Sequence, residues 1–447
     1  MSTAAALLTA ALERMPAGRE QQAPPEPPLM LSGGPGGKDS GSLPRFFFRR
    51  HVETGAVGRE LARTCHGVLR RSIADALPSN DDLDLLWDAL CAAAPAAPGT
   101  DARRASFAQF CAASNNLGPK FKPYFRPSLF LCFGRDELGR IDALQFFNFV
   151  LRKVSLLQAR VDLSAYDADY DGSLSETEMQ TYIQEMMPLL NLRNMNPSFT
   201  KFYLCTAVRK FMFFLDPLRR GRVAIESILL SPILTELFEL RDPDLPRDFE
   251  HSNWFSSYSA LRVYGLFLNL DVDRNGMISR KELTKYRGES ICRVFLDRVF
   301  QEYQTYSGEM DFNAFLDFVL AMENMHSVPS ITYCFKLLDI NGQGYLDRGS
   351  MTIFFRDIVA RMPLLGQDPV PVDDVLNEIF DMANPRELYK VTLQGKWLTS
   401  RQVTAKVNLL TIWPMPDLTK CGMGGTIVSI LCDYRGFHNY ELRDQEK

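Results

Sequence analysis

Residues 271–282 carry oxygen side chains at spacings that could bind a hard divalent cation. Carboxylate or amide oxygens stand at the first, third and fifth positions, a hydroxyl at the ninth and a glutamate at the twelfth. Ca²⁺ takes six to eight oxygen ligands at about 2.3–2.6 Å, and this order of ligands is typical of an EF-hand loop. The expected ligands are Asp271, Asp273, Asn275, the carbonyl of Met277, Ser279 through a water molecule, and both carboxylate oxygens of Glu282.

The same order recurs at residues 167–178, with one more carboxylate than in 271–282. Both loops have glycine at the sixth position, where the chain must turn with φ > 0, and an aliphatic residue at the eighth. The alternative for each loop is a polar turn between two helices that binds no metal. Calcium binding is favoured, because the ligand, glycine and aliphatic positions of an EF-hand loop all occur in the right order. The expected ligands of this loop are Asp167, Asp169, Asp171, Ser173, Ser175 and Glu178.

Helices must flank both loops, because apolar residues recur at helical spacing on either side of them. Four further stretches keep the glycine and aliphatic positions but lose ligands: 134–145, 216–227, 303–314 and 339–350. In 339–350 the main loss is the final glutamate, which is Ser350, so we expect weak binding or none there.

EF-hands work as pairs that are joined by a short β-bridge at the eighth position of each loop. Loops 134–145 and 167–178 start 33 residues apart, and loops 271–282 and 303–314 start 32 apart. These spacings predict that Ile141 pairs with Leu174 and that Ile278 pairs with Met310. A distorted hand around 381–394 is expected to pair with 339–350.

The predicted fold is therefore all-α, with paired EF-hand lobes after a helical N-terminal region. The sequence leaves two alternatives for each of two aromatic stretches. Phe46–Phe48 either packs in the core or lies on another surface, and Phe202–Leu215 is buried either in its own core or against a partner. The expected organisation is a disordered tail (1–43), an N-terminal helical region (44–130), a first EF-hand lobe with a degenerate hand (131–240), a second lobe (250–325), a degenerate C-terminal pair (326–394), an insert (395–416) and a C-terminal tail (417–447).

Composition excludes several classes of function. The chain has 447 residues, is 46% hydrophobic and 23% charged, and carries a net charge of −4, as expected for two or three globular domains. Residues 161–447 hold 39 acidic and 30 basic residues, which does not favour nucleic acid as a partner. The five histidines are isolated, and no hydrolase or kinase motif occurs, so no enzyme is expected.

The cysteines and apolar runs bear on location. Nine scattered cysteines without a C-x-x-C pair favour reduced thiols in the cytosol or nucleus. No apolar run reaches the roughly 18 residues that a membrane span needs. A secretory signal is not expected either, because no basic residue precedes the first apolar run.

Several blocks of sequence occur in a fixed order along the chain: Gln145–Asn148, Arg152–Val154, Cys205–Lys210, Phe214–Arg219, Asn253–Ser256, Ser259–Gly265, Val294–Phe300, Gly308–Asp311, Phe335–Asp339 and Glu378–Met382. Together these blocks resemble the B″ regulatory subunits of protein phosphatase 2A, in particular their gamma type, which includes the plant TONNEAU/FASS proteins. The resemblance covers about residues 44–394 and 417–441. It implies a non-catalytic subunit that docks on the phosphatase scaffold and catalytic subunits, selects phosphoprotein substrates, and works at microtubule arrays, centrosomes or basal bodies. The ligand positions of 271–282 also match the family, whereas those of 167–178 rest on their own residues.

One segment departs from the resemblance. Residues 395–416 interrupt what should run from Gln394 directly into Asp417, and we interpret them as translated intron or a lineage-specific insert. The leading hypothesis for the whole chain is a calcium-responsive targeting subunit, in which calcium either switches the conformation or is always bound and structural. The alternatives are a stand-alone calcium sensor or buffer that binds target helices and, more distantly, an enzyme with calcium-binding lobes.

Overall fold

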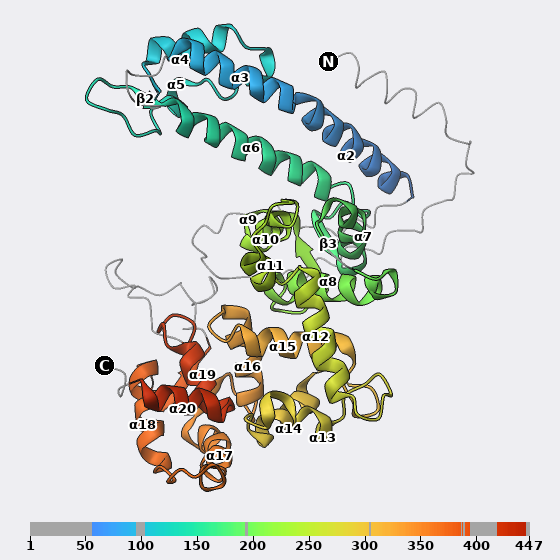
Figure 1. The fold of residues 1–447 in the computed structure, drawn as a ribbon, viewed down its shortest axis with the longest axis vertical. Coiled ribbons are helices and arrows are strands. Elements are labelled where there is room, and N and C mark those ends of the chain that lie inside the picture. Colours follow the sequence, from blue (N-terminus) through green and yellow to red (C-terminus); the bar gives the residue numbers. More distant parts are fainter. Residues whose placement is uncertain are drawn as a thin grey trace, which may run out of the picture. The chain divides into compact units, whose positions relative to one another are not determined.

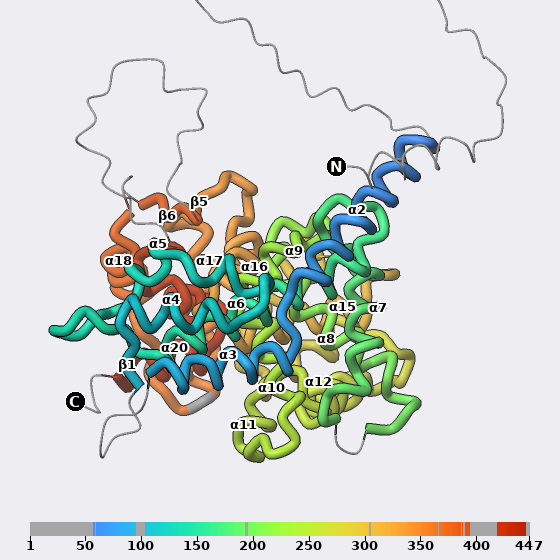
Figure 2. The backbone as a smooth tube through the Cα atoms, turned by 90° about the horizontal axis from the view of Figure 1, so that it is seen from above, coloured from blue at the N-terminus to red at the C-terminus, as the bar shows by residue number. Residues whose placement is uncertain are grey.

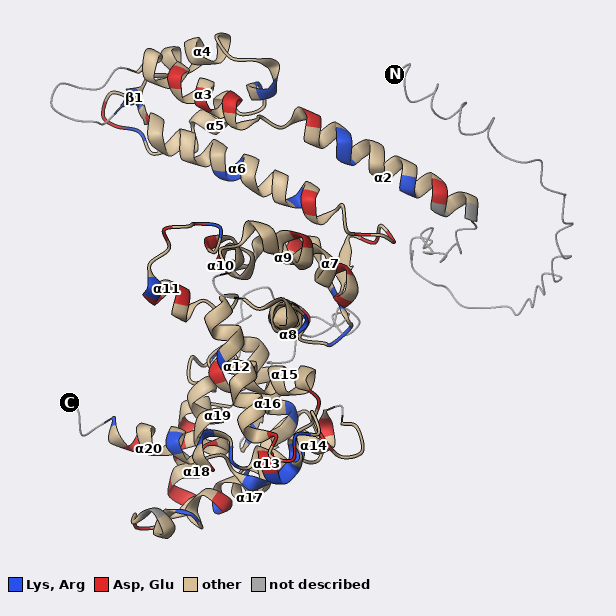
Figure 3. Ribbon diagram, turned by 45° about the vertical axis from the view of Figure 1, so that its right-hand side comes forward, with Lys and Arg blue, Asp and Glu red and all other residues tan. Residues whose placement is uncertain are grey.

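The computed structural model describes residues 56–94, 103–192, 195–303, 305–385, 387, 389–393 and 418–443. The predicted N-terminal tail, the Phe46–Phe48 run and the predicted insert lie outside these ranges. The described chain is mostly helical, with three two-stranded antiparallel ribbons and isolated bridges, which confirms the predicted fold class (Figure 1). Among the described helices, none combines the length and apolar character that crossing a bilayer requires. Figure 3 shows acidic and basic residues interspersed along these elements.

The first hydrophobic core lies in the N-terminal third of the chain. The ring of Phe110 lies 4.7–5.2 Å, between ring centroids, from those of Phe125, Phe130 and Phe146. A reciprocal capping box between Ser79 and Asp82 fixes the start of α3. The elements are α2 (Ala56–Ala76), α3 (Asn80–Ala93), β1 (Arg104–Ala105), α4 (Phe107–Asn115), η1 (Pro119–Phe121), α5 (Pro127–Phe130) and β2 (Ile141–Asp142).

Helix α6 (Ala143–Leu163) connects this core to the second one. Its 21 residues contain no glycine or proline and extend about 31 Å at 1.5 Å per residue. Phe146 and Val150 are buried in the first core, whereas Leu163 is buried in the second. Helices α2 and α3 pack against α6 (Figure 1 and Figure 2).

The predicted pairing of Ile141 with Leu174 is wrong. Ile141 pairs with Ala105 across the β1–β2 ribbon, and Leu174 pairs with Val223. The reason is the unbroken α6, which leaves loop 134–145 and enters loop 167–178 without a turn. The two loops therefore lie at opposite ends of one helix and cannot meet.

The second core begins after α6, and α8 is its central helix. Helix α8 packs against α7, α12 and α15, and it buries aromatic residues including Tyr203 and Phe211. The 202–215 stretch is therefore buried in its own core. The elements are β3 (Ser173–Ser175), α7 (Glu176–Met186), η2 (Met187–Leu189), η3 (Pro197–Phe199), α8 (Thr200–Leu215), β4 (Arg222–Ala224), α9 (Ile225–Leu230), α10 (Pro232–Glu239), α11 (Arg247–Ser252), α12 (Ser257–Leu270), α13 (Arg280–Leu283), η4 (Tyr286–Gly288), α14 (Arg293–Glu302) and α15 (Phe312–Glu323).

The C-terminal elements belong to the same core. Leu346 pairs with Val391 across β5 and β6, which confirms that the distorted hand around 381–394 pairs with 339–350. The segment named as a C-terminal tail contains the helices α19 and α20, whose apolar residues are buried in this core. Cys292 N–H donates to the Cys432 carbonyl at 2.8 Å and ties α19 to the chain before α14. The elements are α16 (Val328–Leu338), β5 (Tyr345–Asp347), α17 (Arg348–Val359), η5 (Met362–Leu365), α18 (Val372–Ala383), β6 (Lys390–Thr392), α19 (Gly424–Cys432) and α20 (Tyr434–Leu442).

Candidate metal centre

Loop 271–282 turns between α12 and α13. Gly276 has φ 80°, a left-handed value that suits glycine. Its N–H donates to Asp271 Oδ2 at 3.0 Å, and Asn275 N–H donates to Asp271 Oδ1 at 3.1 Å. The buried carboxylate of Asp271 therefore holds the turn, and Ile278 is joined to Met310 by reciprocal hydrogen bonds of 2.8 Å. The predicted pairing of Ile278 with Met310 is confirmed.

Three carboxylates converge in this loop. Asp271, Asp273 and Glu282 each offer an oxygen, and these oxygens all lie within 4.8 Å of one another. Glu282 Oε1 accepts the Val272 N–H at 2.7 Å, and Oε2 accepts the Ser279 N–H at 2.9 Å. Burial would raise the pKa of Glu282, but the hydrogen bonds from Ser279 and Val272 outweigh it and lower that pKa. Three carboxylates held together, two of them buried, form a donor set that suits a hard divalent cation.

The other expected ligands lie in the same loop. The Oδ1 atom of Asn275 accepts the Met277 N–H at 2.7 Å. The Ser279 hydroxyl accepts the Glu282 N–H, and Glu282 completes a capping box at the start of α13. The ninth position therefore both faces the loop and begins the next helix.

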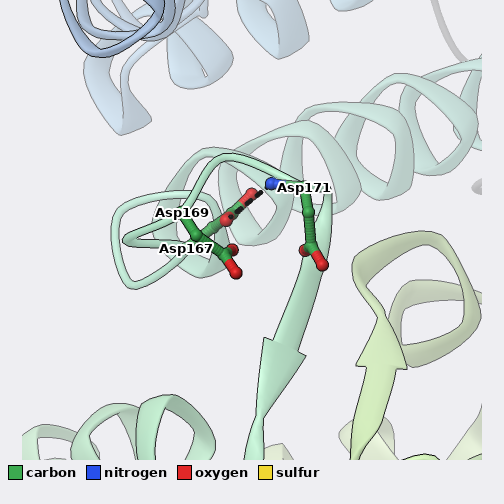
Figure 4. A group of neighbouring side chains, drawn as sticks. All are labelled: Asp167, Asp169 and Asp171. Atoms are coloured by element: carbon green, nitrogen blue, oxygen red, sulfur yellow. Dashed lines mark hydrogen bonds between the residues drawn. The ribbon is translucent and has the colours of Figure 1, made fainter. Parts of the chain in front are cut away.

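Loop 167–178 repeats this geometry. The carboxylate oxygens of Asp167, Asp169 and Asp171 lie within 4.8 Å of one another (Figure 4). Gly172 has φ 79°, and its N–H donates to Asp167 Oδ2 at 2.9 Å. Asp171 N–H donates to Asp167 Oδ1 at 3.2 Å, the bond drawn dashed in Figure 4. Burial, together with the nearby charge of Asp171, raises the pKa of Asp167, so a bound cation would relieve a real electrostatic cost.

The end of this loop is closed by Glu178, which lies outside the three-carboxylate cluster. Glu178 Oε1 accepts the Ala168 N–H at 2.9 Å, and Oε2 accepts the Ser175 N–H at 2.8 Å. These bonds match those of Glu282 at the same loop position. Ser173 N–H donates to Asp171 Oδ1 at 2.7 Å, and Ser175 caps α7. The residues of both loops therefore fit Ca²⁺.

The degenerate loops keep the turn without the ligands. Gly221 N–H donates to Asp216 Oδ2 at 2.7 Å, and Gly344 N–H donates to Asp339 Oδ2 at 2.6 Å. Their first aspartate thus has the structural role of Asp271 even where later ligands are missing. Weak or absent metal binding at 339–350 stays a prediction.

Two charged side chains that reach loops 167–178 and 271–282 were missed by the sequence reasoning. Arg222 Nη1 donates to Asp169 Oδ2 at 2.8 Å and also to Asp171 Oδ2. Glu309 Oε2 accepts a hydrogen bond from Asn275 Nδ2 at 3.1 Å. Both residues stand at position seven of the partner loop. This position of an EF-hand loop usually contributes its backbone carbonyl to the metal, so the loop motif predicts no role for its side chain. The antiparallel bridge was the available signal, because its register places Arg222 opposite Ser175.

A separate cavity of about 1030 Å³ lies beside the degenerate loops. It is lined by residues of 216–221, 303–317 and 339–342, among them Arg219, Tyr303 and Asp317. None of the twelve expected calcium ligands lines it, so the cavity is distinct from the two metal loops.

Comparison with known proteins relates one of these loops, and most of the chain, to known sequences. The EF hand family model matches residues 265–285. The B″-type gamma regulatory subunit of serine/threonine-protein phosphatase 2A from Bos taurus is 42% identical over 406 residues, which cover 90% of this chain and 84% of that protein. TON2 of Arabidopsis thaliana, a probable B″-type regulatory subunit of the same phosphatase, is 35% identical over 422 residues, which cover 91% of this chain and 83% of that protein.

A solved structure shares the fold. A chain described as part of a PP2A PR70 holoenzyme (diCa) superposes with a TM-score of 0.50 and 21% identity, over 60% of this chain and 94% of that chain. The match supports the helical EF-hand architecture.

Proposed function

Because this chain belongs to the B″ family of protein phosphatase 2A regulatory subunits, and is itself non-catalytic, we propose that it is a calcium-binding subunit of a phosphatase 2A holoenzyme. The observation that carries the calcium part is the convergence of three carboxylates in each of two glycine-kinked loops. Bound calcium supplies the positive charge that these acidic groups lack. The residues of the chain hold the turns, orient the carboxylates and start the following helices.

The proposed partners are the scaffold and catalytic subunits of the phosphatase, together with phosphoprotein substrates. Support comes from the similarity to the gamma subunit and to TON2, which extends over most of the chain. We further propose that the subunit directs the phosphatase to substrates at microtubules, centrosomes or basal bodies, and that it resides in the cytoplasm or nucleus. The plant relative and the resemblance to its branch support this targeting role.

The test combines calcium titration with assembly. Glu282→Gln removes one ligand charge, while glutamine at this position still completes the capping box with Ser279. We expect the full-length chain to bind two calcium ions in calorimetry, and the variant to lose affinity at one site by on the order of tenfold or more. We also expect near-equal amounts of scaffold and catalytic subunits to co-purify with the chain, as measured by quantitative mass spectrometry.

The outcomes separate the parts of the proposal. A chain that takes up no calcium contradicts the metal sites. A chain that binds calcium but captures no phosphatase supports the second candidate function, a stand-alone sensor or buffer. The two complete EF-hand loops would suit that function as well. Equal assembly in calcium and in chelator, by a calcium-binding chain, assigns the metal a structural role and leaves the regulatory role in place.

A further inference from the structure

The seventh residue of each degenerate partner loop reaches the fifth residue of the calcium loop beside it. In the first pair Arg222 donates to Asp171 and, at 2.8 Å, to Asp169. In the second pair Glu309 accepts from Asn275 at 3.1 Å. The two contacts occupy equivalent positions, because both pairs are joined through antiparallel bridges at the eighth residue, Leu174 with Val223 and Ile278 with Met310. The contacting side chains carry opposite charges.

These side chains reverse the difference in net negative charge between the two loops. Loop 167–178 has four ligand carboxylates and loop 271–282 has three, because position five is Asp171 in one and Asn275 in the other. With Arg222 the first site has a net charge of three negative, and with Glu309 the second gains a fourth carboxylate. The number of ligand charges is one of the two properties that set the calcium affinity of an EF-hand loop.

Arg222 occupies space where a cation would bind. Its Nη1 atom contacts carboxylate oxygens at positions three and five of the same loop, both of which are calcium ligands in an EF-hand. The Arg222 side chain is 50% exposed, so it can leave for solvent when calcium arrives. It therefore competes with the metal rather than blocking it. A related arrangement occurs in loop 134–145, where the Arg140 guanidinium lies 2.9 Å from Asp136.

Glu309 acts through orientation as well as charge. It holds the Nδ2 side of the Asn275 amide, which Asp273 Oδ2 also contacts at 3.2 Å. With the nitrogen held there, the amide oxygen is left for the loop, where a calcium ligand is needed. Glu309 is thus a positioning residue for the fifth ligand.

We propose that the degenerate loops tune the complete ones in opposite directions: Arg222 weakens calcium binding at 167–178, and Glu309 strengthens it at 271–282. This inference rests on the proposed calcium binding. A consequence is that loop 271–282 fills first, although loop 167–178 contains more carboxylates. The degenerate hands then have a role besides packing, since each sets the calcium concentration to which its neighbour responds.

The test measures each site alone in the full-length chain by calorimetric titration with calcium chloride. Glu282→Gln leaves loop 167–178 as the intact site, and Glu178→Gln leaves loop 271–282. In the first background we expect Arg222→Gln to tighten binding by roughly twofold to fivefold, the size expected for a partly exposed charge pair. In the second background we expect Glu309→Gln to weaken binding by a similar factor.

Matched controls remove the same charge elsewhere. Arg220→Gln lies in the same degenerate loop, and Glu239→Gln lies at the end of α10; both residues are exposed and should change affinity by less than twofold. Circular dichroism of every variant checks that the fold is kept. If Arg222→Gln leaves binding unchanged or weakens it, or if Glu309→Gln leaves it unchanged or tightens it, the inference is overturned while calcium binding stands. If the unsubstituted chain binds no calcium, the proposed function and this inference both fall.

Discussion

The ninth residue of the complete loops has two structural roles. Ser175 and Ser279 each face the loop and also accept the N–H of the third residue of the next helix. The glutamate at the twelfth position completes the same capping box. Loop closure and helix initiation are therefore coupled, because one pair of side chains serves both. This coupling explains how a loop can keep its shape with its carboxylates near one another.

Cysteine reactivity offers a residue-scale prediction. All nine cysteines are free thiols, of which Cys65, Cys111 and Cys132 are exposed. Burial raises the pKa of Cys292 to about 12, and it also raises the pKa of Cys432 well above its ordinary value. Because the thiolate is the reactive form, iodoacetamide at about pH 8 should modify the three exposed cysteines of the native chain and spare the two buried ones. Peptide mass spectrometry before and after denaturation measures this.

The denatured sample is the internal control, since all five thiols should react there at similar rates. Rapid labelling of Cys292 in the native chain would mean that the contact between α19 and the chain before α14 opens readily.

At this scale the clustering of the loop carboxylates could be predicted and the charges beside them could not. The loop motif predicts which side chains converge, and the structure brings Asp271, Asp273 and Glu282 together. Arg222 and Glu309 belong to other loops. Their influence depends on which hands pair, which is a property of the elements.

The spacing between EF-hand loops does not by itself predict which hands pair. Separations of 33 and 32 residues are nearly equal, yet only the second is a pair. Between loops 271–282 and 303–314 the chain reverses at Arg287, Gly288 and Glu289, all with positive φ. Between loops 134–145 and 167–178 helix α6 continues without a breaker. Glycine and proline in the connecting segment therefore predict pairing better than its length does.

The predicted insert gives an element-scale prediction. The Leu418 N–H donates to the Thr392 carbonyl at 3.1 Å, so the described residues on either side of the segment lie next to each other. With residues 395–416 deleted and Gln394 joined to Asp417, Leu418 would follow Thr392 by four positions, and the same hydrogen bond would close an α-turn. We expect the deletion to leave the free energy of unfolding unchanged or to raise it by up to about 2 kcal/mol, because the loop that the hydrogen bond closes becomes much shorter and its closure costs less entropy. Urea unfolding measures it.

Leu418→Ala is the matched comparison for this deletion. The Leu418 side chain is fully buried, so its truncation should cost about 2–5 kcal/mol. A deletion variant that is destabilised as much as Leu418→Ala would show that the segment is an integral part of the fold.

At the scale of the whole molecule, one core joins the hands from loop 167–178 onward. It contains buried residues from Ala159 to Tyr440, and α8 lies between helices of different hands. Helix α8 leads into loop 216–227, which pairs with 167–178, whereas α15 follows loop 303–314, which pairs with 271–282. Contact between α8 and α15 therefore connects the two calcium-loop pairs. We expect this part of the chain to unfold as one cooperative unit.

A buried ion pair holds that contact. Arg209 of α8 donates to Asp317 of α15 through Nε at 3.0 Å and Nη2 at 2.6 Å, and Arg219 Nη2 lies 3.0 Å from the same carboxylate. The Asp317 side chain is only 4% exposed. Asp317→Asn would leave the mostly buried Arg209 guanidinium with only Glu176, 3.6 Å away and half-exposed, as its counter-charge. This loss should cost about 3 kcal/mol.

The comparison is Glu323→Gln at the end of α15. Glu323 pairs with Arg262 at 2.7 Å, but these side chains are 25% and 37% exposed, so its loss should cost less than about 1 kcal/mol. Urea unfolding followed by both tryptophan fluorescence and circular dichroism should show one coincident transition in each variant, shifted to much lower urea only in Asp317→Asn. Separate transitions in the unsubstituted chain would mean that the two calcium-loop pairs are independent domains. Equal costs for the two substitutions would mean that apolar packing, rather than the ion pair, holds α8 against α15.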